Sequence, residues 1–136
     1  METREIKFRA ISEETDDMRY GSLTVEYDGT CHINWWVSLC IEPENNYYEP
    51  APFFEVVKKE TIGQFTGLTD KNGKEIFEGD VIKNARGDWG VIVWKAPYFE
   101  VTVSETQSSL YSREYFDEVE IIGNIHEHPE LLTPNN

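Results

Sequence analysis

Cysteines, basic residues and long apolar runs are all scarce in this chain, and each shortage excludes a class of protein. Cys31 and Cys40 are the only cysteines among 136 residues. Two cysteines are too few for a disulfide-rich secreted scaffold or a four-cysteine zinc site, so we expect both thiols to be reduced. No apolar run approaches the roughly 20 residues of a membrane-spanning helix, and Met1–Ile11 does not resemble a signal peptide. We therefore expect a soluble, cytoplasmic protein without a membrane partner.

Basic residues are strongly outnumbered by acidic ones. The chain has 12 Lys and Arg against 26 Asp and Glu, which gives a formal net charge of −14. Residues 99–136 carry eight acidic residues and one basic residue, which is half of that net charge. No local basic patch offsets the total, so the chain repels phosphate groups and we expect no direct contact with nucleic acid.

Sequence motifs for nucleotides, cofactors and nucleophilic catalysis are missing as well. The glycines form neither a G-x-x-x-x-G-K-S/T nor a G-x-G-x-x-G pattern. Neither cysteine lies in a motif that would supply it with a general base. We expect no cofactor.

The apolar content is sufficient for one hydrophobic core. Hydrophobic residues make up 39% of the chain and aromatic residues 13%, which argues against disorder and, at this length, for a single domain over residues 1–136. Residues 1–60 are expected to supply N-terminal strands and an aromatic insertion, and residues 61–136 a barrel-like part. Glu42–Pro52 reads as a long loop or insertion because it is rich in proline and asparagine.

Short runs of β-branched and aromatic residues predict strands. Asp28-Gly29 predicts a hairpin turn, and Ala96-Pro97 predicts a second one. Pro52–Glu60 is compatible with one or two helical turns, and Pro129–Leu132 predicts a terminal helical turn. The expected strands are residues 7–11, 23–27, 32–39, 61–66, 91–94, 99–103 and 118–125.

Turn residues are dense in the second half of the chain. Asn72-Gly73 and Glu78-Gly79-Asp80 predict two chain reversals close together. Because closure hides the edges of a sheet, we expect a β-rich α+β fold with a small SH3-like barrel or a strongly bent sheet over residues 76–125. The residues that we interpret as structural are Gly67, Asn72, Gly73, Gly79, Asp80 and Gly123.

Three sequence blocks, in order, resemble the YopX family. They are Arg4–Ala10 (REIKFRA), Phe65–Ile82 (FTGLTDKNGKEIFEGDVI) and Ile122–Leu132, with Ile-Gly-Asn-Ile followed by His-Pro-Glu-Leu-Leu. Ile11 stands where an aromatic residue often occurs, and the aromatic-rich region Cys31–Phe54 has no clear counterpart. The resemblance implies a mostly β fold and a phage or prophage context in a bacterial host cell. It carries over no catalytic residue.

Candidate sites for chemistry are weak. His126 and His128, next to Glu127 and Glu130, have metal-ligand composition, but two solvated histidines before Pro129 explain them more simply. Asp70-Lys71-Asn72-Gly73 is a turn, because its glycine and its twelfth residue do not fit a calcium loop. Convergence of Glu78, Asp80 and Asp88 would be needed for acid–base catalysis, whereas aspartate in such turns usually accepts backbone N–H bonds.

Two surfaces are candidates for binding a partner. Adjacent aromatic residues on a strand point to opposite faces, so one ring of each pair can be core while its neighbour is exposed, unless both faces are covered. No Lys or Arg occurs between Cys31 and Pro52, which favours a protein over single-stranded nucleic acid. The aromatic pairs are Trp35-Trp36, Tyr47-Tyr48 and Phe53-Phe54.

The second candidate surface is acidic. It comprises Glu114, Asp117, Glu118 and Glu120, and it is either a solvated face or a DNA-mimic-like surface for a basic protein. The sequence therefore favours a non-enzymatic protein-interaction module. The alternative is a structural or assembly role through homo-oligomerisation, and an enzyme of unknown reaction is the third hypothesis.

Overall fold

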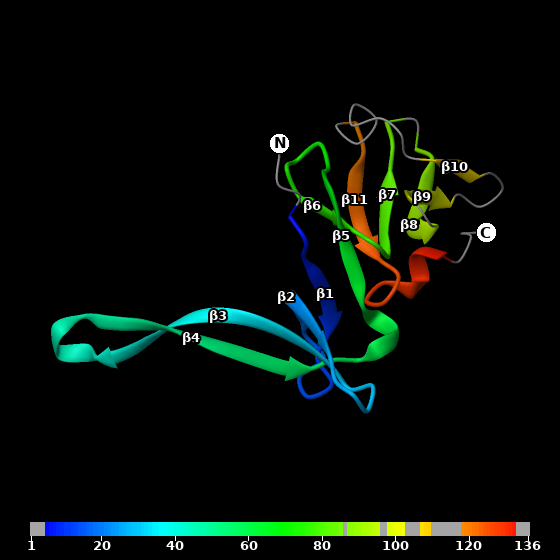
Figure 1. The fold of residues 1–136 in the computed structure, drawn as a ribbon. Helices are drawn as coiled ribbons and strands as arrows, with labels where there is room; N and C mark the ends of the chain where they lie inside the picture. The colour runs from blue at the N-terminus through cyan, green and yellow to red at the C-terminus, as the bar shows by residue number, and fades with distance from the viewer. Residues whose placement is uncertain (1–4, 86, 96–97, 103–106, 110–117, 133–136) are drawn as a thin grey trace. The chain divides into compact units, whose positions relative to one another are not determined.

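The computed structural model describes residues 5–85, 87–95, 98–102, 107–109 and 118–132, and most of them lie in antiparallel strands (Figure 1). This confirms the mainly β fold. Helical conformation in these residues is limited to three short 3₁₀ segments. No helix in the described part is long and apolar enough to cross a lipid bilayer.

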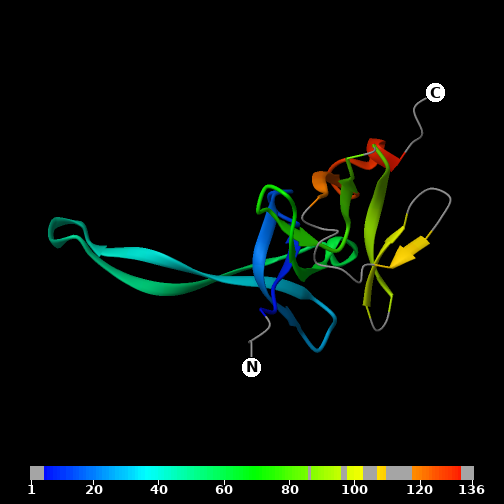
Figure 2. The same ribbon diagram turned by 90° about the horizontal axis from the view of Figure 1, so that it is seen from above.

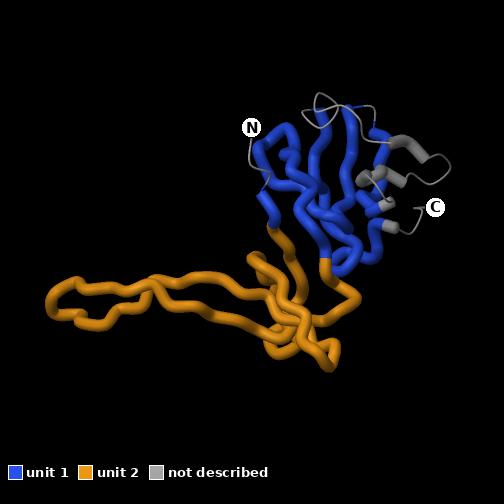
Figure 3. The backbone as a smooth tube through the Cα atoms, in the orientation of Figure 1, with its two compact units in different colours: residues 1–6, 63–136 blue, residues 7–62 orange. Residues whose placement is uncertain are grey.

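The chain divides into two compact units (Figure 3). Unit 1 comprises residues 1–6 and 63–136, and unit 2 comprises residues 7–62. The division after residue 62 lies close to the boundary at residue 60 that separates the two parts of the expected single domain. Whether both units form one domain stays a prediction.

Unit 2 is an antiparallel sheet with the strand order β4-β3-β2-β1. Its core is formed by Ala10, Cys31, Ile33 and Val57. The segment that follows β4 contacts the end of β1: the Lys58 N–H donates to the Ile11 carbonyl at 2.8 Å. The Thr61 hydroxyl accepts the Ile11 N–H at 2.9 Å, which satisfies a buried backbone donor. The strands are β1 Phe8–Ile11, β2 Met18–Val25, β3 Cys31–Glu42 and β4 Tyr47–Val56.

The hairpin expected at Asp28-Gly29 joins β2 to β3, as predicted. Gly29 has a φ of 91°. The Asp28 carboxylate accepts the Thr30 N–H at 2.9 Å, and this hydrogen bond lowers the pKa of Asp28. The turn therefore has the local chemistry that Asp-Gly supplies.

The prediction for Glu42–Pro52 was a loop or an insertion, and the loop is wrong over most of this stretch. The helical turns expected over Pro52–Glu60 are also wrong over most of their length. A 3₁₀ turn at Pro43–Asn45 and the left-handed Asn46 reverse the chain, and β4 then runs to Val56. Asparagine tolerates this conformation, and the aromatic and β-branched residues after Pro52 favour a strand. Helical conformation in this stretch is confined to the 3₁₀ segment Lys59–Thr61.

Unit 1 consists of the β5–β6 hairpin and a sheet with the strand order β10-β9-β8-β7-β11. Its core cluster contains Ile76, Ile82, Ile92 and Val119, with Leu68 and Ile121 packed against it. A 3₁₀ segment, Pro129–Leu132, forms the expected terminal turn. The strands are β5 Gly63–Thr69, β6 Glu75–Phe77, β7 Asp80–Lys83, β8 Trp89–Lys95, β9 Tyr98–Thr102, β10 Gln107–Ser109 and β11 Glu120–Asn124.

Of the two predicted architectures for this region, the described residues agree with a strongly bent sheet and not with a closed barrel. β10 and β11 are the edges of the five-stranded sheet, and they do not pair with each other in the described residues. β8 and β9 form the hairpin expected there, but its Ala96-Pro97 turn lies outside the described residues.

Candidate functional site

The Asn72-Gly73 turn is built around a buried carboxylate. Asp70 is 4% exposed, and one of its oxygens accepts the N–H groups of Asn72 and Lys74, each at 2.9 Å. The other oxygen accepts the Ile121 N–H at 3.1 Å. Gly73 has a φ of 80°, which suits glycine. Asp70 therefore joins the turn to β11 within unit 1.

The ionised form of Asp70 is stabilised by this arrangement. Burial alone would raise the pKa of Asp70, but hydrogen bonds from the backbone of Ile121, Lys74 and Asn72 outweigh it, and the pKa lies below its usual value. A carboxylate held in this way is a structural group that is already saturated with donors.

Asp80 is a second buried carboxylate that accepts a backbone N–H group. It is 1% exposed, and its carboxylate accepts the Phe77 N–H at 2.7 Å. Gly79, at a φ of 94°, donates its N–H to the Ile92 carbonyl and accepts the Ile125 N–H through its own carbonyl. Asp88 instead lies in a separate turn, where its N–H donates to the Asn84 side chain at 3.0 Å.

Gly67 and Gly123, the two remaining glycines predicted to be structural, differ in what constrains them. Gly67 has a φ of 88°. A Cβ at Gly123 would lie 2.7 Å from the Cδ1 of Leu131 and 2.9 Å from the ring nitrogen Nδ1 of His128, so a larger residue there would displace these side chains. The same Nδ1 accepts the Asn124 N–H at 3.2 Å. His128 is therefore part of the turn that follows β11, and the described residues contain no group of three metal-ligating side chains.

The acidic C-terminal surface is only partly described. Glu118 and Glu120 are exposed, and the carboxylate of Glu120 lies 3.7 Å from the Lys71 ammonium. Glu114 and Asp117 lie outside the described residues. An exposed ion pair of this kind contributes little to stability but offsets part of the local negative charge.

The longest feature of unit 2 is the distal β3–β4 hairpin, which we call the arm and define as Trp35–Phe53. Figures 1 and 2 show β3 and β4 continuing as a two-stranded ribbon beyond β2. β2 pairs with β3 only from Cys31 to Asn34, whereas the β3–β4 ladder extends to Glu42 and Tyr47. An isolated two-stranded ribbon is at best marginally stable in water.

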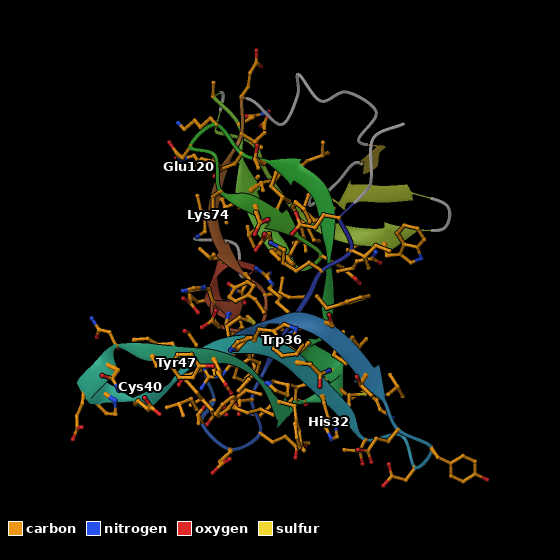
Figure 4. The ribbon with its side chains drawn as sticks, turned by 60° about the vertical axis from the view of Figure 1, so that its left-hand side comes forward. His32, Trp36, Cys40, Tyr47, Lys74 and Glu120 are labelled. Atoms are coloured by element: carbon orange, nitrogen blue, oxygen red, sulfur yellow. The ribbon has the colours of Figure 1, made fainter. Side chains whose placement is uncertain are left out.

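One face of the β3–β4 hairpin presents exposed aromatic rings. Paired residues share a face, and the register pairs Trp36 with Pro52, Asn34 with Phe54, and Cys40 with Tyr48. Trp36 is 72% exposed, Phe54 62% and Tyr48 51%. We call these three residues the aromatic face; Figure 4 labels Trp36 on β3.

The opposite face is fixed to the core at its root. The Trp35 ring packs against the core cluster and stacks on Phe53, with ring centroids 6.4 Å apart. The Arg19 guanidinium lies 5.9 Å from the Trp35 ring centroid, and its Nε lies 3.2 Å from the Glu55 carboxylate. Hydrogen bonds from Ser12 and then Arg19 lower the pKa of Glu55.

The two tryptophans therefore divide as expected, one against the core and one exposed. The other two aromatic pairs do not. Tyr47 and Tyr48 are both exposed, and so are Phe53 and Phe54. The reason is that the ribbon has no second layer on either face in the described part of unit 2.

The charge of the β3–β4 hairpin is uniformly negative. No Lys or Arg occurs from Cys31 to Val57. A surface pocket of about 460 Å³ is lined by Phe54 and Val56 together with Glu13, Glu14 and Glu55. A second, of about 420 Å³, lies at the tip and is lined by Ile41, Glu42, Pro43, Glu44 and Asn45. Both pockets combine apolar and acidic groups.

Tyr47 adds a polar contact near the tip of the arm. Its hydroxyl donates to the Glu49 carboxylate at 2.7 Å, and this hydrogen bond raises the pKa of Tyr47. The sequence analysis predicts a loop or insertion here and not a two-stranded ribbon, although one feature of the sequence indicates an edge strand. Pro50 and Pro52 are two residues apart, the spacing of an edge strand that keeps both prolines on its unpaired side.

Comparison with known proteins covers nearly the whole chain. The crystal structure of protein EF1440 from Enterococcus faecalis is similar to it, with 25% sequence identity, a TM-score of 0.61, and coverage of 96% of this chain and 100% of that one. No curated protein sequence matches the chain. The sequence profile described as YopX protein matches residues 7–133. The chain therefore belongs to the YopX family.

Proposed function

We propose that this YopX protein is a non-enzymatic protein-interaction module of a phage or prophage, and that it acts in the cytoplasm of the bacterial host. The observation that carries the proposal is the aromatic face. Trp36, Phe54 and Tyr48 lie on one side of a ribbon and are each more than half exposed. Exposed aromatic rings on one face of a strand pair can bury a large apolar area against a protein partner.

The negative charge around the arm indicates a basic partner. Glu42, Glu44 and Glu49 accompany the apolar residues of the arm, and no base balances them between Cys31 and Val57. Opposite charge accelerates association and discriminates against acidic proteins. The same charge opposes phosphate groups, so the partner is proposed to be a protein rather than nucleic acid.

A non-enzymatic role is supported by what the candidate carboxylates already do. Asp70 and Asp80 are buried and accept backbone N–H bonds, and Asp88 closes a turn with Asn84. None of these contacts places a carboxylate at a solvent-filled cleft. Their chemistry is that of turn stabilisation.

The test compares variants in affinity purification of the tagged full-length chain from infected host cells, after nuclease treatment. We expect a stoichiometric partner to be lost when Trp36 and Phe54 are both changed to Ala. The matched control is Tyr27→Ala, which removes a fully exposed ring from the β2–β3 turn. Loss with Tyr27→Ala as well, or retention with the double variant, would contradict the proposal.

A third variant examines the DNA-mimic-like form of the hypothesis. Glu118→Lys combined with Glu120→Lys reverses charge on the acidic surface of unit 1 without altering the arm. Partner loss with this variant alone would place binding there. Recovery of only the bait, as an oligomer by light scattering, would favour the alternative assembly role.

A further inference from the structure

The two edges of the β3–β4 hairpin present different backbone groups. In an antiparallel ladder, pairs that exchange N–H···O bonds alternate with pairs whose N–H and C=O groups point outward. Pro50 lies opposite Ser38, and Pro52 lies opposite Trp36. Because proline has no N–H to exchange, these pairs belong to the outward-pointing set.

Two contacts at the root support this assignment. The carbonyl of Val56, which is in the same alternation as the prolines, accepts the Glu13 N–H at 3.0 Å from outside the β3–β4 ladder. On the other strand, the Asn34 carbonyl points to β2, where a Cβ at Gly21 would lie 2.0 Å from it. Even-numbered residues of both strands therefore point their backbone groups outward.

The β4 edge of the arm is protected by this arrangement. Pro50 and Pro52 remove two successive outward donors, a substitution that natural sheets use to prevent another strand from pairing at an edge. The β3 edge has no such protection. Trp36, Ser38 and Cys40 retain outward N–H and C=O groups, and no described strand pairs with them on that side.

The β3 edge is also free of charge along its length. Residues 35–41 contain no acidic or basic residue, and Glu42 and Glu44 follow at the tip. An edge of this kind is a template for β-augmentation, in which main-chain hydrogen bonds give affinity and side-chain contacts give specificity. The acidic tip provides charge complementarity for a basic group at one end of the added strand.

We propose that the β3 edge between Trp36 and Cys40 binds an extended segment of a basic partner protein as an additional strand. The segment carries β-branched residues in its centre and Lys or Arg at the end beside Glu42 and Glu44. This inference rests on the proposed interaction function and specifies its geometry. A second copy of the chain fits less well, because its β3 strand has no Lys or Arg to place beside Glu42 and Glu44 and because each copy has a net charge of −14.

The first experiment measures amide hydrogen exchange in the full-length protein by NMR. Without a ligand, the N–H groups of Trp36, Ser38 and Cys40 are expected to exchange rapidly, and those of Val37 and Leu39 slowly. The probe is the peptide Lys-Lys-Val-Thr-Val-Thr-Val-Lys-Lys. At saturation it is expected to slow exchange at the three outward groups by about tenfold or more. Unchanged exchange at those groups would overturn the proposal.

Matched peptides and variants separate backbone pairing from side-chain contact. A peptide with Glu in place of Lys is expected to bind at least about tenfold more weakly, and so is a backbone N-methylated peptide. Ser38→Pro removes one outward donor opposite Pro50, and we expect about a tenfold loss of affinity for the lysine peptide. Ser38→Ala keeps that donor and is expected to bind within about twofold of wild type.

The outcomes distinguish this inference from the proposed function. If Ser38→Pro retains full affinity for the lysine peptide, strand addition is wrong. The interaction function still stands in that case if the Trp36 and Phe54 double variant loses its cellular partner. If the unmodified chain dimerises and Ser38→Pro is monomeric, the occupant of the edge is a second copy and the basic partner is wrong.

Discussion

The Asp70 turn of unit 1 and the arm of unit 2 use their most distinctive side chains in opposite ways. In the turn, a buried carboxylate accepts three backbone N–H groups and joins the turn to β11. On the β3–β4 hairpin, by contrast, Trp36 and Phe54 are exposed to solvent and lie outside the core cluster of unit 2. The difference shows that the block FTGLTDKNGKEIFEGDVI, which carries the family resemblance, specifies architecture. The exposed aromatic rings lie instead on the β3–β4 hairpin of unit 2, within the residues that the family profile also matches.

Removing the carboxylate of the turn has the largest expected effect. Asp70→Ala leaves three backbone donors without their acceptor, and we expect a loss of about 3 kcal/mol or more in the free energy of unfolding. Urea denaturation measures it. Lys71→Ala, in the same turn but exposed, is the control and is expected to cost within about 0.5 kcal/mol. Equal effects of both changes would contradict the structural role of Asp70.

A second test concerns the root from which the arm extends. Gly21→Ala would place a Cβ 2.0 Å from the Asn34 carbonyl, so β2 and β3 must separate locally. We expect a destabilisation of about 2 to 3 kcal/mol, the cost of overpacking a tight contact. Ser22→Ala, one residue along β2, is the control. Fast amide exchange along β2 and β3 in Gly21→Ala alone would locate the damage at the root.

The two adjacent tryptophans sharpen the comparison within the arm itself. Trp35→Ala removes a ring that contacts the core, Phe53 and Arg19, and we expect a cost of about 2 kcal/mol. Trp36→Ala removes an exposed ring and is expected to change stability by less than about 0.5 kcal/mol. Thermal unfolding of both variants provides the measurement. A larger effect of Trp36→Ala would mean that the aromatic face supports the fold.

The smallest expected effect depends on pH. Because the pKa of Asp70 is lowered in the folded state, its ionised form contributes stability above the ordinary aspartate pKa of about 3.9, and this contribution is lost as the pH falls through the folded-state value. Asp70→Asn is expected to cost about 1 kcal/mol at pH 7. Urea titrations between neutral and acidic pH should show the two proteins converging as the pH falls. A constant difference would contradict this assignment.

Sequence patterns predicted the strands and turns whose causes are local. The Asp28-Gly29 hairpin, the 72–73 turn and the terminal helical turn depend on residues within a few positions of one another. The division of Trp35 and Trp36 between two faces followed from strand geometry alone. Most expected strands were correct in type and differed at their ends, as β2 does by beginning at Met18 rather than Leu23.

The errors arose where distant residues decide the structure. Pro52–Glu60 is compatible with helical turns on sequence grounds because Pro52 is tolerated at a helix start, but pairing with β3 makes Pro52–Val56 a strand. Asp70 was recognised as a turn residue, yet its bond to Ile121 depends on a strand 51 positions away. The exposure of both Phe53 and Phe54 could not be predicted from the sequence either, because it depends on the absence of a covering layer in the described part of unit 2.

The continuity of unit 2 along the chain has a consequence for biosynthesis. Residues 7–62 form this unit without interruption, whereas unit 1 is completed only by residues that follow Ile62. Domains generally fold as units during translation, the N-terminal ones first, and a hairpin with sequence-local contacts forms rapidly. Each β3–β4 pair of the arm joins residues at most 18 positions apart, so we expect this hairpin to close without any residue of unit 1.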